Sequence, residues 1–327
     1  MRYIISLAFA SALALPAAAE VPVVVTDIQP VQSLVAMVMG DLAAPDLLLP
    51  KGGDEHSYQM KPSQAAALAE AGLVVWIGPE LTPWLDRALD GLGSGPAQLV
   101  LLDAPGTVTR QFAAGAEEEH AHEDNHDHGA EGEDGHDHDH AAEGEEGHDE
   151  EHHHHDGTDP HAWLDPQNAV LWLDLIADRL AQIDPDHAET YAANAAAAQA
   201  QIGALDADLT AQLGAVADRP FIAFHDAFGY FVAHYGLTLA GTVALGDASA
   251  PGAARLAEIR DLAANGAVCI FPEVQHDPKM VETIAADTGV KQGGALDPTG
   301  SSMEPGPDLY PAMMSTLADT LVACLTP

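Results

Sequence analysis

The sequence predicts an α/β protein with two lobes, each built on a parallel sheet, joined by one long rigid helix. Strand-like apolar runs alternate with helix-like segments on both sides of the chain's middle, a pattern typical of parallel sheets covered by helices. Between them, residues 185 to about 213 form a segment rich in Ala and Gln. As a helix of about thirty residues it would span about 45 Å. We interpret it as a strut between lobes; packing within a single domain is the alternative.

The first half of the chain supplies the strands and helices of the first lobe. The run at 21–25 is rich in Val, which favours a strand. The segment 30–40 has apolar residues at helical spacing and a Gly at its end. We expect strands at 21–25, 47–49, 73–77 and 99–102, and helices at 30–40, 62–71, 83–89 and 168–183.

The second half repeats the pattern after Asp184 and Pro185, which end one helix and begin the next. We expect strands at 221–224, 239–245, 268–271 and 290–296, and helices at 253–265, 277–288 and 310–325. These segments predict a first lobe over 20–183, a connecting helix over 184–216 and a second lobe over 217–327.

Residues 1–19 have the pattern of a secretory signal peptide. Arg2 gives a positive start, an apolar run follows at 4–15, and Ala fills 17–19 before a cleavage site. The apolar run is too short to span a membrane, and no Cys stands at the cleavage site for lipid attachment. We expect a soluble, exported mature protein that begins near Glu20.

The charge of the chain excludes whole classes of partner. With 11 Lys and Arg against 51 Asp and Glu, the formal net charge is −40. Nucleic acid and anionic membrane surfaces would be repelled. A cationic ligand is compatible with this charge.

The stretch 117–156 consists almost entirely of Glu, Asp, His, Gly and Ala. We expect a disordered loop, because a segment this polar cannot bury enough apolar surface to offset its ordering entropy. His alternating with carboxylates is a composition for binding zinc; a solvated acidic spacer is the alternative, or an expression tag for 152–155. Of the 18 His in the chain, 12 lie in this stretch: His120, His122, His126, His128, His136, His138, His140, His148, His152, His153, His154 and His155.

The chain has two cysteines, Cys269 and Cys324. An even count in an exported protein favours one disulfide, here between a strand and the last helix. Two buried thiols or two zinc ligands are the alternatives.

Three of the six His outside the loop share a context. His56, His161 and His225 each follow a predicted strand or a Gly/Pro turn, where α/β sheets place ligands. Each has a carboxylate beside it or two residues away that could orient an imidazole: Glu55, Asp159 and Asp226. Three imidazoles with a carboxylate or water suit tetrahedral zinc, but spacing alone does not bring these residues together.

Several segments, in order along the mature chain, resemble the signature segments of the ZnuA-type family, the zinc-binding periplasmic components of ABC uptake transporters. The resemblance implies two α/β lobes, one long helix and a metal site between the lobes. The segments are Gly52-Gly-Asp-Glu-His56-Ser-Tyr58 with Pro62-Ser63, Asp159-Pro-His161-Ala-Trp-Leu-Asp-Pro166, His225-Asp-Ala-Phe-Gly-Tyr-Phe231, Glu273-Val-Gln275 and Leu296-Asp297-Pro298.

The same resemblance implies a ligand set. His56, His161 and His225 would bind the metal, and His at the third position favours zinc over manganese, whose carriers have a carboxylate there. Glu55 is a candidate fourth ligand and Asp297 the alternative; water could replace either. The resemblance also supports the disulfide and a His- and acid-rich insertion as an auxiliary zinc site.

We expect the other conspicuous side chains to serve packing or support. His187, His234 and His276 are assigned structural or surface roles, and Trp163 a place in the core near the site. Glu273 and Gln275 are candidates for supporting the ligands.

The expected function is capture of zinc in the periplasm and its delivery to an ABC permease by a monomer, without catalysis. A zinc-buffering or adhesin-like protein, a manganese carrier and an exported zinc hydrolase are the alternatives. Three His ligands would permit hydrolysis, but the sequence has no HExxH motif and no clear general base.

Overall fold

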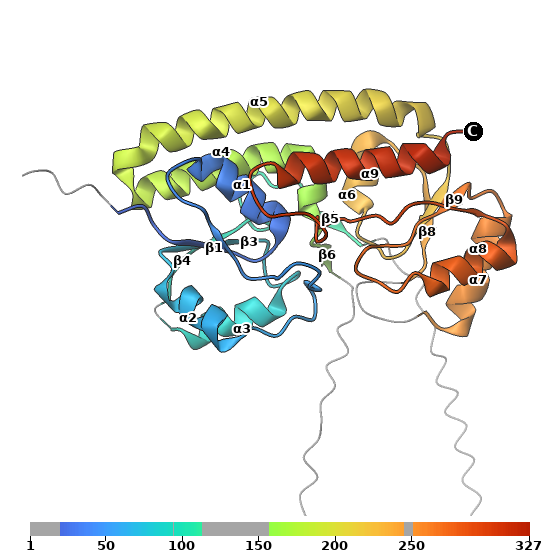
Figure 1. The fold of residues 1–327 in the computed structure, drawn as a ribbon, viewed down its shortest axis with the longest axis horizontal. Coiled ribbons are helices and arrows are strands. Elements are labelled where there is room, and N and C mark those ends of the chain that lie inside the picture. The colour runs from blue at the N-terminus through green and yellow to red at the C-terminus, as the bar shows by residue number, and fades with distance from the viewer. Residues whose placement is uncertain (1–19, 94, 113–156, 245–250) are drawn as a thin grey trace, which may run out of the picture.

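The computed structural model describes residues 20–93, 95–112, 157–244 and 251–327. The predicted signal peptide and the His-rich stretch 117–156 lie outside these ranges. Two α/β lobes lie side by side beneath a long helix, α5 (Figure 1). Within the described ranges, no helix has both the length and the apolar character that crossing a bilayer requires.

The first lobe is built on a four-stranded parallel sheet in the order β2-β1-β3-β4. One sheet face packs on α1, and the opposite face is covered by α2 and α3. Both faces are therefore buried, and the strands β1 and β3 are apolar nearly throughout. The elements are β1 (Val24–Thr26), α1 (Gln29–Met39), β2 (Asp46–Leu47), α2 (Pro62–Glu70), β3 (Leu73–Trp76), α3 (Pro83–Gly91) and β4 (Ala97–Val100).

The second lobe repeats this architecture with the parallel sheet order β10-β9-β7-β8. One face packs on α6 and α9, and the other on α7 and α8. The elements are β7 (Phe221–Ala223), α6 (Gly229–Tyr235), β8 (Leu239–Thr242), α7 (Ala253–Ala264), β9 (Cys269–Ile270), α8 (Lys279–Thr288), β10 (Lys291–Gln292) and α9 (Leu309–Leu325).

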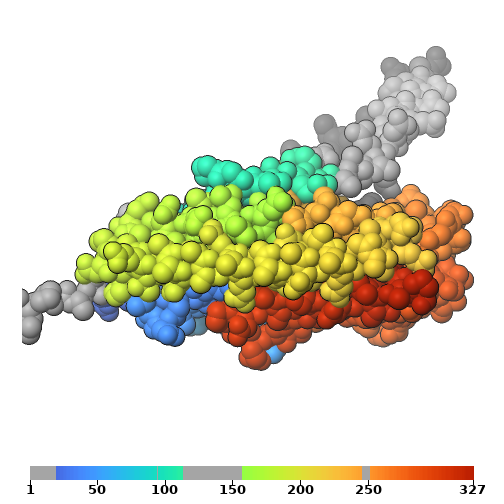
Figure 2. Space-filling view, turned by 90° about the horizontal axis from the view of Figure 1, so that it is seen from above, coloured from blue at the N-terminus to red at the C-terminus, as the bar shows by residue number. Residues whose placement is uncertain are grey.

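The helix α5 (Ala188–Leu213) joins the lobes, and α4 (Pro166–Ile183) precedes it in the first lobe. At 26 residues, α5 is about 39 Å long. It contacts α1 and α4 of the first lobe and α6 and α9 of the second. Seen from above, α5 runs along the molecule between α4 and α9 (Figure 2). The predicted fold class is confirmed, while the exact lobe boundaries stay a prediction.

Several predicted boundaries differ from the structure. The long helix starts at Ala188 because 185–187 form a separate 3-10 turn, held by Asp184, which accepts hydrogen bonds from the Tyr191 hydroxyl and the His187 ring. Of the strand predicted at 290–296, only Lys291–Gln292 pairs as a strand. Leu296 forms a single bridge with Glu273.

A short antiparallel pair was not predicted. Strand β5 (Arg110–Gln111) pairs with β6 (Thr158–Asp159). In the sequence the two strands stand on either side of residues 113–156, and their pairing places the described residues that flank this segment side by side. The second of these strands, β6, ends two residues before His161.

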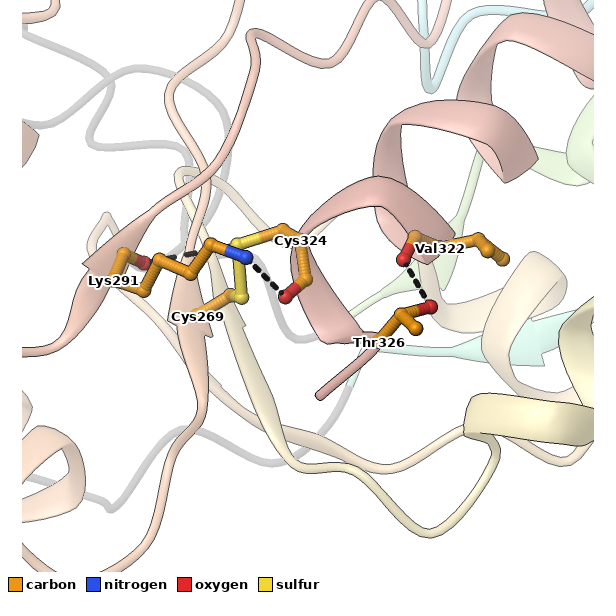
Figure 3. Close-up of a disulfide and its surroundings, with 5 residues drawn as sticks. All are labelled: Cys269, Lys291, Val322, Cys324 and Thr326. Atoms are coloured by element: carbon orange, nitrogen blue, oxygen red, sulfur yellow. Dashed lines mark hydrogen bonds between the residues drawn. A yellow bond between two sulfur atoms is a disulfide. The ribbon is translucent and has the colours of Figure 1, made fainter.

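The predicted disulfide is confirmed. Cys269 on β9 and Cys324 on α9 are bonded, with Cα atoms 6.3 Å apart (Figure 3). The Lys291 Nζ donates a hydrogen bond to the Cys324 carbonyl at 2.9 Å. Because the bond joins residues 55 positions apart, loop entropy predicts a contribution of about 4 kcal/mol to stability. It attaches the last helix to the second sheet.

His234 joins three elements where the lobes meet. It lies on α6; its Nδ1 is 3.1 Å from Asp165 at the start of α4, and its Nε2 is 2.7 Å from Asp206 on α5. The hydrogen bond with Asp165 raises the pKa of His234, and Asp206 adds to this against the opposing effect of burial. The expectation of a structural role for His234 agrees with this position.

This contact predicts a pH dependence of stability. A raised folded-state pKa means that the stabilisation is complete below the unfolded pKa of about 6.5 and is lost as pH rises through the folded value. His234→Gln should lower the free energy of unfolding by about 2 kcal/mol at pH 6, and its stability should change less than the wild type's as pH rises. Urea unfolding of the zinc-free protein at pH 6 to 9 measures this; an unchanged pH slope in the variant would contradict it.

Candidate metal centre

His56 is presented by a tight turn of the first lobe. The carboxylate of Asp54 accepts hydrogen bonds from the His56 backbone N–H at 2.9 Å and the Ser57 hydroxyl at 2.7 Å. The turn is attached to α3, because the Trp84 indole N–H donates to the Glu55 carbonyl at 2.7 Å. The position of His56 is therefore set by its own neighbours and by one buried Trp.

His161 is fully buried just after β6. One oxygen of Asp159, Oδ1, lies 3.0 Å from the His161 backbone nitrogen and 2.8 Å from its Nδ1. This leaves Nε2 as the ligand atom and fixes the ring orientation. The predicted pairing of Asp159 with His161 is confirmed.

His225 follows β7 and is oriented by Glu273 of the same lobe. One oxygen of Glu273 accepts from the His225 backbone N–H at 3.0 Å, and the other is bonded to its Nδ1. The sequence offered the adjacent Asp226 as the acceptor for His225 and Glu273 as a supporting residue, and the contact between Glu273 and His225 confirms the supporting role of Glu273. The parallel pairing of β7 with β9, whose partner residues are 48 positions apart, brings Glu273 beside His225.

The three His rings converge between the lobes. Their centroids are 5.4 to 6.5 Å apart, and one ligand nitrogen from each lies within 4.8 Å of the others. Trp163 packs against His161 at 5.2 Å between ring centroids, and Phe228 lies 6.4 Å from His225. Neutral imidazoles in such a partly apolar pocket suit a borderline divalent cation.

Glu55 supplies a buried acidic group beside these rings. Burial raises its pKa to about 7, the nearby His225 and His161 oppose this, and Asp54 adds to it. Its Oε1 lies 3.9 Å from the His56 Nε2, and its Oε2 accepts from the Gln275 amide at 2.9 Å. A buried carboxylate in this position can ligate a cation that offsets its desolvation.

Asp297 is buried but engaged elsewhere. Its Oδ1 accepts hydrogen bonds from the backbone and hydroxyl of Ser301, and its Oδ2 from those of Ser302. Both oxygens thus hold the turn at 297–302. Pro298 next to it accepts a hydrogen bond from the Trp163 indole at 2.8 Å, which joins the two lobes beside the site.

Two other predicted positions can be located. His187 stands at the start of the long helix with Asp184. His276 was assigned a structural or surface role, yet its ring centroid lies 5.8 Å from that of His225. The predicted auxiliary His residues of 117–156 lie outside the described residues.

Comparison with known proteins agrees with this geometry. The family model for "Zinc-uptake complex component A periplasmic" matches residues 24–324. The high-affinity zinc uptake system protein ZnuA of Paracoccus denitrificans is 52% identical over 324 residues, which cover 98% of each chain. That of Brucella suis is 40% identical over 311 residues, covering 93% of this chain and 91% of the relative.

A crystal structure of a ZnuA deletion mutant with zinc bound superposes with a TM-score of 0.71 at 25% identity, covering 94% of this chain and 99% of the other. A second ZnuA crystal structure gives 0.70 at 26% identity, covering 93% and 100%. The match to the family model and the identity with curated relatives extend over nearly the whole chain. The chain therefore belongs to the family of periplasmic components of zinc-uptake complexes.

Proposed function

We propose that this protein captures one zinc ion between its lobes and delivers it to the membrane permease of an ABC uptake transporter. The observation that carries the proposal is the convergence of His56, His161 and His225 from both lobes into one pocket. Two of the rings are held by a carboxylate through Nδ1, the arrangement that presents Nε2 to a metal. The zinc ion is cargo, and the protein carries out no reaction on it.

Glu55 is our proposed fourth ligand. It lies beside His56 in a buried position, whereas the two oxygens of Asp297 each accept two hydrogen bonds within their own turn. Ligation by Asp297 would require those bonds to break. Three imidazoles and one carboxylate complete a tetrahedral zinc site.

We further propose that the mature chain is a monomer released into the periplasm by cleavage after residue 19, and that it has no enzymatic activity. The signal-like pattern of 1–19 and the family's periplasmic description support the location. A ligand set that fills all four positions of zinc leaves none for a catalytic water, which supports a carrier over a hydrolase.

Replacing all three imidazoles tests the site. The variant His56→Ala, His161→Ala, His225→Ala should lose tight zinc binding by at least about a thousandfold, because structural zinc affinity depends on its full ligand set. Competition with a chelator of known affinity measures the dissociation constant. His187→Ala, a histidine at the start of α5, is the control and should bind as the wild type. Tight binding retained by the triple variant would refute the proposed site.

The orienting carboxylate of His225 can be tested alone. Glu273→Gln keeps the shape of the side chain but removes its charge, so zinc affinity should fall about 10- to 100-fold. The matched control is Glu282→Gln, an exposed residue on α8. Calorimetric titration of both variants compares them; equal affinities would show that Glu273 does not support the ligand.

We propose the His-rich stretch 117–156 as an auxiliary, weaker zinc site that collects ions beside the main one. The described strands that flank it in the sequence, β5 and β6, pair with each other directly before His161. Deleting 117–156 should lower the total zinc bound per chain and leave one tightly bound ion. Metal analysis after equilibrium dialysis counts the ions, and an unaltered total would rule out binding by this stretch.

A further inference from the structure

His276 stands at the outer edge of the three-His pocket. It lies between β9 and α8, and its ring stacks on Phe224 with centroids 4.4 Å apart and planes 27° apart. Side-chain exposure rises from 0% for His161 and 4% for His225 to 13% for His56 and 31% for His276. The four imidazoles therefore form a graded series from the buried pocket to solvent.

A small hollow connects His276 with the inner ligands. Its free volume is about 10 Å³, close to the least that admits one water molecule. This space suits a single ion rather than an organic ligand. The residues lining it are Asp54, Glu55, His56, His225, Gln275 and His276.

Two residues that line this hollow, His225 and His276, also lie near Glu273, at separations close to those of metal ligands. The His276 Nε2 lies 4.0 Å from the Glu273 Oε2, and ligand atoms of His225, Glu273 and His276 lie within 4.8 Å of one another. Two ligands of one tetrahedral zinc are about 3.4 Å apart. A side-chain shift of well under an ångström would bring His276 and Glu273 to that separation.

We propose that His276 and Glu273 form a second, outer zinc position through which the ion enters and leaves the three-His site. The inference rests on the proposed function, because it adds an exchange step to that same site. With two protein ligands and water completing the shell, the outer position holds zinc more weakly than the inner one. Glu273 belongs to both positions through one oxygen. Its Oε2 is hydrogen-bonded to the His225 Nδ1 and lies 4.0 Å from the His276 Nε2, and the second lone pair of that oxygen can bind the outer ion.

A stepwise exchange of ligands explains why such a position is useful. An ion leaving three imidazoles and a carboxylate at once would lose every protein ligand before it is hydrated. With His276 in reach, one new bond forms as an old one breaks, and the barrier falls equally for entry and exit. His276 therefore affects the rates of exchange and leaves the equilibrium affinity of the inner site nearly unaltered.

The test compares exchange rates in the full mature chain with zinc ions alone as the probe. His276→Phe retains an aromatic ring to stack on Phe224 but removes the ring nitrogens. Stopped-flow association, and dissociation into excess chelator, should both slow by about tenfold, the effect of a modest rise in one shared barrier. The dissociation constant from competition titration should change less than about twofold.

Controls separate this role from others. His187→Phe makes the same substitution at the start of α5 and should keep the wild-type exchange rates. If His276→Phe disturbs folding, His276→Ala should still show the slow exchange. Unchanged exchange rates in both His276 variants would overturn the proposal. A weaker affinity for zinc with an unchanged association rate would also overturn it, because His276 would then be part of the inner site. A failure of the proposed function is distinguishable, because the wild type itself would then lack tight zinc binding.

Discussion

One hydrophobic core shared by both lobes is the constraint on which the rest of the structure depends. One face of each sheet packs into it together with α1, α4, α5 and α9. The opposite faces are covered separately, by α2 and α3 in one lobe and by α7 and α8 in the other. The lobes therefore cannot separate without exposing apolar surface that both of them bury. Ligands contributed by different lobes are held near their final separation before any ion arrives.

In the metal pocket, two carboxylates each link the backbone of a histidine to the imidazole ring of the same residue. Asp159 and Glu273 each bind the backbone N–H of the histidine whose Nδ1 they also hold. A rotation of either ring would therefore disturb the loop that carries it, and a movement of the loop would rotate the ring. Preorganisation of this kind lowers the entropy lost on binding. His56 differs, because its turn is held by Asp54 while its ring faces the buried Glu55.

The sequence predicted what depends on local pattern and missed what depends on distant pairing. Asp159 lies two residues from His161, so its role could be inferred from the sequence. Glu273 lies 48 residues from His225 and is brought there by the pairing of β7 with β9, so the sequence alone could not assign it to that histidine. The short strands β5 and β6 have too few residues for an alternation to be visible. The convergence of the three His was inferred from the family resemblance and not from their spacing. The disulfide was inferred from the even number of cysteines and from the same resemblance.

The shared core also limits how zinc can be released. Trp163 of the first lobe donates to the Pro298 carbonyl of the second, and Gln275 donates to both Glu55 and Thr299. The bonds from Trp163 to Pro298 and from Gln275 to Glu55 cross between the lobes beside the pocket, where wide opening would break both of them. A carrier built in this way must release its ion through small displacements at the pocket's edge. The edge is formed by loops, those of His56 and His276 among them, while the sheets and α5 keep their positions.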